Sequence, residues 1–156
     1  LLDIENMPNL NRLIDEGSIG LMNTRGVNGY KGAESFATIN ASSKAYANNE
    51  SSQLYNLSGE YKRIYENRIG IIDGEYAIGN IQLGKLCNQN EKNRYSPYIG
   101  ALGHSLHEVG LKTAAFGNSD TDEEIIRTGS LIAMDSKGLI DYGEVEDRLL
   151  EDIPME

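Results

Sequence analysis

Hydrophobic residues near the start of the chain follow a helical spacing and then a strand-like run. Three apolar side chains share one face of a helix predicted over residues 8–16, which Pro8 opens and Gly17 ends. The apolar run that follows predicts a buried strand over residues 18–24. Because a helix leads directly into a strand here, the pattern is typical of an α/β protein.

A second helix is predicted over residues 34–47, after a loop over residues 26–33 that contains three glycines. Its small face allows close packing, and its hydroxyl groups form a separate stripe. The large apolar face consists of Phe36, Ile39 and Tyr46, the small face of Ala37, Ala41 and Ala45, and the stripe of Ser35, Thr38 and Ser42.

The second half of the chain predicts a further run of alternating elements. A helix over residues 97–109, with Ser96 as its N-cap, precedes a strand over residues 111–117. The polar turn Asn118-Ser119-Asp120 follows that strand. The remaining predictions are a helical turn over 122–129, a strand, a turn at Gly138 and a second strand over 130–142, and a helix over 144–153.

Residues 48–96 differ from the rest, with eight asparagines and weak periodicity. The sequence around Asp73-Gly74 predicts a β-hairpin, and a short helix is predicted near residues 78–90. We interpret this segment as an insertion or cap within a single, partial α/β domain over residues 1–156. The chain does not begin with Met, so we expect a piece of a longer protein.

Charge and composition exclude several function classes. The net charge is −10, and residues 120–156 hold 12 acidic and 3 basic residues. A chain this acidic lacks the Lys and Arg that nucleic acid or an anionic membrane requires, so neither is expected as a partner. No apolar run is long enough for a transmembrane segment. The single cysteine, Cys87, excludes an internal disulfide framework.

The glycine-rich loop and the helix after it form the first candidate site. A loop that enters a helix N-terminus presents free N–H groups and the positive end of the helix dipole to an anion. Ser35 and Thr38 lie there and are candidate nucleophiles if a base or metal lowers their pKa. The alternative is that Ser35 caps the helix and Thr38 is a small packing residue.

Asn118 and Asp120 form the second candidate, because ligands bind at the carboxyl ends of strands in open α/β sheets. The alternative is an ordinary polar turn. His104 and His107 are three residues apart on a helix, but no acid or cysteine accompanies them at a metal-site spacing, so we interpret them as surface histidines. The two acids around the Gly138 turn, Asp135 and Asp141, are interpreted as turn residues.

Three segments together resemble the alkaline phosphatase/sulfatase superfamily. MPNLNRLIDEGSIGLMNTR resembles its PNLxRLxxEG helix and strand, and LGHSLHEVGLKTAAFGNSD resembles its LxxxGYxTxxxGK helix and strand. ESFATINASSKAYA occupies the place of the helix that carries the nucleophile. Residues 118–142 are similar to the continuation seen in uncharacterised, envelope-associated bacterial members. The resemblance covers residues 7–47 and 100–120.

The resemblance implies a three-layer α/β/α fold with a mostly parallel sheet, and hydrolysis or transfer of small phosphate or sulfate esters. It implies a divalent metal (Zn, Mn or Mg) in the complete site, with ligands outside this chain. Ser35 and Thr38 are the implied catalytic residues, and Lys31, Asn118 and Asp120 the implied substrate-binding residues. The residues that would bind the metal, and the oligomeric state, are unknown.

Two departures from the superfamily pattern keep a second function open. Strict register places Tyr30 or Lys31 at the nucleophile position, and Asn118 replaces an anion-binding lysine. These departures favour a catalytically inactive relative that binds a ligand or a partner in the cell envelope. A third alternative is a generic α/β binding domain whose asparagine- and tyrosine-rich middle forms the contact surface.

Overall fold

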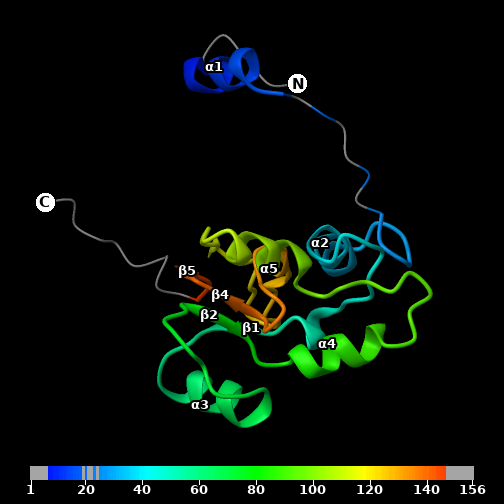
Figure 1. Ribbon diagram of the computed structural model, residues 1–156, viewed down its shortest axis with the longest axis vertical. Helices are drawn as coiled ribbons and strands as arrows, with labels where there is room; N and C mark the ends of the chain where they lie inside the picture. The colour runs from blue at the N-terminus through cyan, green and yellow to red at the C-terminus, as the bar shows by residue number, and fades with distance from the viewer. Residues whose placement is uncertain (1–6, 19, 21–22, 24, 147–156) are drawn as a thin grey trace, which may run out of the picture.

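The computed structural model describes residues 7–18, 20, 23 and 25–146 of the chain (Figure 1). It is a mixed α/β structure, which confirms the predicted class at that level. The helices are α1 (Pro8–Glu16), α2 (Gly32–Asn40), α3 (Gly59–Arg68), α4 (Leu83–Asn90), α5 (Ala101–Glu108) and the 3₁₀ helices η2 (Asn49–Ser51) and η3 (Thr128–Ile132). The strands are β1 (Leu54–Asn56), β2 (Ile78–Asn80), β3 (Ala114–Phe116), β4 (Leu139–Ile140) and β5 (Tyr142–Glu144).

The strands form two small sheets rather than one large parallel sheet. The larger sheet has the order β1-β2-β4 and is antiparallel throughout. Parallel pairing within the described residues is confined to β3 and β5, where Ala114 lies opposite Tyr142. The mostly parallel sheet implied by the resemblance is therefore not what these residues form on their own.

The main core lies where α2, α4 and η3 pack around the antiparallel sheet. The three predicted alanines, Ala37, Ala41 and Ala45, are all buried, but only Ala37 lies within α2, which packs closely on η3. Small side chains permit this close approach because they occupy little volume between the two backbones. Other fully buried members of the core are Leu54, Ile78, Leu86, Leu131, Met134, Ile140 and Val145.

The first half of the chain matches the predicted elements in part. α1 spans residues 8–16 as predicted, whereas most of the strand predicted over 18–24 lies outside the described residues. The helix predicted over 34–47 ends at Asn40, because the chain turns at Ser42, whose φ is +55°. Ser42 therefore leaves the helix, and the predicted hydroxyl stripe is wrong at that residue.

Two predictions around α5 are also wrong. The helix begins at Ala101 instead of residue 97, and Ser96 has a φ of +46° instead of the extended backbone of an N-cap. Gly100 occupies the position before the helix with a φ of +86°. A Cβ atom there would lie 2.3 Å from the backbone of Asp135, so glycine is required at this contact.

The segment over residues 48–96 forms α3, β1, β2 and α4. The short helix predicted near 78–90 is confirmed as α4, but the hairpin at Asp73-Gly74 is wrong because no strand precedes it. Instead, β2 pairs with the distant strands β1 and β4. The interpretation of this segment as an insertion or cap stays a prediction.

After β3, the predicted first strand over 130–142 is replaced by η3, and β4 and β5 follow the Gly138 turn. Glu144 belongs to β5, and most of the helix predicted over 144–153 lies outside the described residues. Each helix in the described part of the chain is too short and too polar to cross a lipid bilayer.

Candidate functional site

The predicted catalytic hydroxyls lie on α2 but differ in their surroundings. Ser35 is half-buried in the first turn, and its backbone N–H donates to the Lys31 carbonyl at 2.8 Å. Thr38 is also half-buried, and its Oγ1 accepts a hydrogen bond from the Ala45 N–H at 3.1 Å. Thr38 thus stabilises the turn after the helix, as in its packing interpretation.

A cleft of about 430 Å³ adjoins the start of α2 and reaches α4. Its lining residues are Asn28, Lys31, Glu34, Tyr46, Ala47, Asn48 and Gln89. Lys31 also lines a neighbouring cavity of about 380 Å³ at η2. Lys31 is exposed, and its ammonium has no ion-pair partner among the residues that the structure describes. This is the positive charge expected at an anion site.

Glu34 organises the glycine-rich loop beside this cleft. Its carboxylate is buried and accepts hydrogen bonds from the Asn28 N–H at 2.7 Å and from Asn28 Nδ2 at 2.6 Å. Gly26 packs so closely that a Cβ atom would lie 2.5 Å from Glu34 Cβ. Glu34 was not singled out from the sequence, although an acid in the first turn of a helix is a recognisable signal.

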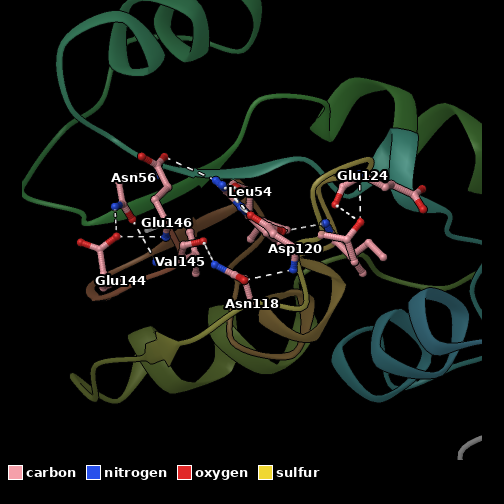
Figure 2. A network of polar contacts seen from close by, with 11 residues as sticks. Leu54, Asn56, Asn118, Asp120, Glu124, Glu144, Val145 and Glu146 are labelled. Atoms are coloured by element: carbon pink, nitrogen blue, oxygen red, sulfur yellow. Dashed lines mark hydrogen bonds and ion pairs between the residues drawn. The ribbon is translucent and has the colours of Figure 1, made fainter. Parts of the chain in front are cut away.

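Asn118 and Asp120 follow β3 as predicted, but they belong to an internal polar network (Figure 2). Asn118 Nδ2 donates to the Val145 carbonyl at 2.9 Å, and Oδ1 accepts the Asp120 N–H at 3.0 Å. Asp120 Oδ1 accepts the Ile126 N–H at 2.7 Å, and Oδ2 accepts Arg127 Nε at 2.9 Å. These bonds hold the loop after β3 in place, as the polar-turn interpretation requires.

Arg127 is the centre of this network and was missed from the sequence. Its side chain is only 7% exposed, and it donates to the Leu54 carbonyl at 3.2 Å and to Glu146 Oε1 at 3.4 Å. Its guanidinium lies 4.8 Å from the centre of the Tyr55 ring. A buried arginine requires this dense pairing, because an uncompensated charge in the interior is costly.

A cavity of about 440 Å³ lies between β3 and η3, beside this network. Its walls include Phe116, Asn118, Ile126 and Ser130. Asn118 is the one predicted site residue among the described residues that line it. The structure therefore places the residues near α2 and the residues after β3 on different cavities.

The residues around the predicted nucleophiles do not fit a divalent metal. No three His, Cys, Asp or Glu side chains come together as a metal site within residues 7–18, 20, 23 and 25–146. Glu34, the acid next to Ser35, already accepts two hydrogen bonds from Asn28. An ion such as Zn²⁺ or Mg²⁺ needs several such donors around one point.

His107 and the two predicted turn acids form a second polar cluster. Asp135 is a turn residue as interpreted, because its Oδ1 accepts the N–H groups of Lys137 and Leu139, whereas the interpretation of His107 as a surface residue is wrong. His107 Nε2 lies 2.7 Å from Asp141 Oδ2, and Nδ1 lies 3.4 Å from Asp135 Oδ2. The Asp135 and Asp141 side chains are 7% and 2% exposed, and that of His107 is 20% exposed. Lys112 Nζ donates to Asp141 Oδ1 at 2.7 Å, and the Thr113 N–H donates to Oδ2 at 2.9 Å.

The pKa of Asp141 is lowered by this cluster. Burial by itself raises the pKa of the carboxyl group, but hydrogen bonds from Lys112, the Thr113 N–H and His107, with the His107 charge, lower it to about 2. Because the folded-state pKa lies below the unfolded one, ionised Asp141 stabilises the fold above about pH 4. That stabilisation is lost as the pH falls through about 2.

We predict that Asp141→Asn lowers the free energy of unfolding by about 2 kcal/mol at pH 5. The difference from the unsubstituted chain should shrink as the pH falls towards 2, because the carboxyl group becomes neutral in both states. Urea unfolding of both chains at several pH values measures this. If the difference in unfolding free energy between the two chains does not depend on pH, the ionised Asp141 carboxylate does not stabilise this cluster.

Comparison with known proteins identifies no family for this chain. No family model, curated protein or solved structure matches the chain.

Proposed function

We propose that this chain is part of a catalytically inactive relative of the alkaline phosphatase/sulfatase superfamily, which binds a small phosphate or sulfate ester without hydrolysing it. The observation that carries the proposal is the exposed Lys31 at the cleft beside the start of α2. A lysine next to the N–H groups of a helix N-terminus favours an anionic ligand. The three-layer fold implied by the resemblance is proposed for the complete protein, with β3 and β5 in its parallel part.

Binding is favoured over hydrolysis because three of the five candidate polar groups, all except Ser35 and Lys31, are engaged within the fold. Thr38 bonds Ala45, Asn118 bonds Val145, and Asp120 bonds Arg127. A group that holds a turn or neutralises a buried arginine is not free to attack or orient a substrate. Neither the donor set near Ser35 nor any described group of acids supports the metal that the hydrolase would use.

The binding test uses inorganic phosphate, inorganic sulfate and their aryl esters, with affinity measured by calorimetry. Lys31→Gln should weaken binding about tenfold, because a charge-assisted hydrogen bond to the anion is lost. Lys62→Gln is the matched control, since Lys62 is exposed on α3 and does not line the cleft. Equal affinities for the two variants would contradict the Lys31 site.

The hydrolase alternative is tested by turnover of the same aryl esters with added Zn²⁺, Mn²⁺ or Mg²⁺. We expect no metal-dependent turnover from the complete protein. Turnover that disappears in Ser35→Ala, or in Thr38→Ala, would replace the binding proposal with an active phosphate- or sulfate-ester hydrolase. Turnover that both variants retain would show a hydrolase whose nucleophile lies elsewhere.

A further inference from the structure

His107 joins three separate parts of the fold. It lies in the last turn of α5, Asp135 lies in the turn before β4, and Asp141 lies between β4 and β5. Each ring nitrogen faces a different carboxylate, at 2.7 Å and 3.4 Å. A neutral imidazole has one N–H and one lone pair, whereas the imidazolium has two N–H donors. The Nε2 contact to Asp141 is a hydrogen bond and the Nδ1 contact to Asp135 is an ion pair, so only the imidazolium carries the charge that attracts both carboxylates.

We propose that His107 is a proton-dependent clasp that holds α5 and the start of β3 against the β4–β5 corner. In the protonated state, its charge and that of Lys112 balance the two buried carboxylates. When one proton leaves, a lone pair faces a carboxylate oxygen, and the cluster retains one uncompensated negative charge. Such a charge is unfavourable among buried groups, so the contact to Asp135, the longer of the two, is released.

The charged and titratable groups around His107 are consistent with this balance. Lys112 follows α5 and reaches Asp141, while the Tyr76 ring, from the segment before β2, lies 6.3 Å from the imidazole centre. On α5 itself, Glu108 pairs with His104 at 3.7 Å. The two carboxylates in contact with His107 are thus opposed directly by Lys112 alone among the described residues, which leaves the second positive charge to His107.

The clasp is connected to the wall of the cavity between β3 and η3. Asp141 accepts the Thr113 N–H at 2.9 Å, and the Thr113 carbonyl accepts the Tyr142 N–H at 3.1 Å. Thr113 comes directly before β3, whose residues line that cavity. Release of Asp135 frees His107 and α5 on one side, so we expect the effect to reach β3 through Asp141, which contacts both His107 and the Thr113 N–H. The anchoring of β3 beside this cavity would therefore depend on whether His107 is protonated.

The test is hydrogen exchange of residues 111–117, followed by mass spectrometry at about pH 5.5 and about pH 8 and corrected for intrinsic exchange rates. We expect the protection of this segment to fall about tenfold at the higher pH, because the ion pair between His107 and Asp135 is lost. His107→Gln, which cannot gain a proton, should show the same protection at both values. Equal pH responses in the two proteins would overturn the proposal.

Two further variants separate the clasp from general effects of pH. His104→Gln removes the other histidine of α5, which is half-exposed and pairs with Glu108, and should keep the full response. Asp135→Asn keeps an oxygen to accept the Lys137 and Leu139 N–H groups but removes the charge that faces Nδ1. It should abolish the response even if His107→Gln does not fold. A full response in Asp135→Asn, or loss of the response in His104→Gln, would overturn the proposal.

Discussion

Asn40→Ala is expected to lower the free energy of unfolding by about 3–5 kcal/mol, since three buried backbone groups lose their partner. Asn40 is the last residue of α2 and is fully buried. Its Nδ2 donates to the Ile132 carbonyl at 3.1 Å and to the Met134 carbonyl at 2.8 Å. Its Oδ1 accepts the Gly100 N–H at 2.7 Å. One side chain thus joins α2 to η3 and to the start of α5.

Chemical denaturation of Asn40→Ala measures this effect, and Asn40→Asp refines it. Aspartate can still accept the Gly100 N–H, but it places a negative charge against two carbonyl oxygens, so it should be at least as destabilising as alanine. Asn88→Ala is the control, because Asn88 is exposed on α4 and its loss should change stability by less than about 0.5 kcal/mol. A similarly small effect at Asn40 would refute the role of this junction.

Arg127→Met is expected to cost a similar amount, about 3–5 kcal/mol, because it leaves Asp120 without its partner in a mostly buried position. The substitution also removes the bond to the Leu54 carbonyl and the stacking on the Tyr55 ring. Thermal or urea unfolding measures the loss. The double variant Asp120→Asn with Arg127→Met should cost less than the sum of the two single variants, since it removes both charges.

This pair also distinguishes the two interpretations of Asp120. If Asp120 has a structural role, Asp120→Asn should cause a large loss of stability, and its effect should be strongly coupled to that of Arg127→Met. If Asp120 instead binds a ligand, Asp120→Asn should weaken the affinity for phosphate or sulfate esters with little loss of stability. Arg63→Met, on the exposed side of α3, serves as the control for loss of an arginine. Strictly additive effects of the two single variants would exclude the proposed ion pair as a stabilising contact.

Local sequence patterns are sufficient to predict several elements of the fold. Pro8 and Gly17 bracket α1, the alanine spacing identifies three buried residues, and polar residues follow β3 as predicted. Each of these features depends on residues within a few positions of one another. Helical periodicity and turn chemistry are local properties, so the sequence expresses them directly.

The failed predictions have a common cause. Asp135 is the turn residue that its neighbours indicate, but the contacts of His107 with Asp135 and Asp141 join residues 28 and 34 positions apart, which the local pattern does not reveal. The pairing of Asp120 with Arg127 across the loop is likewise not visible in the local sequence pattern. The hairpin at Asp73-Gly74 failed because β2 pairs instead with strands that are distant in the sequence.

The sequence by itself thus determined the α/β class, helix α1 and the acidic character, and it proposed the anion-site candidate at Lys31. The tertiary structure decided which polar groups remain accessible, since a side chain's availability depends on partners that loop closure brings to it. Burial makes these pairings obligatory, because a charge or hydrogen-bonding group that leaves water must find a partner inside the fold. That requirement pairs the buried Arg127 with Asp120 and places His107 between two carboxylates.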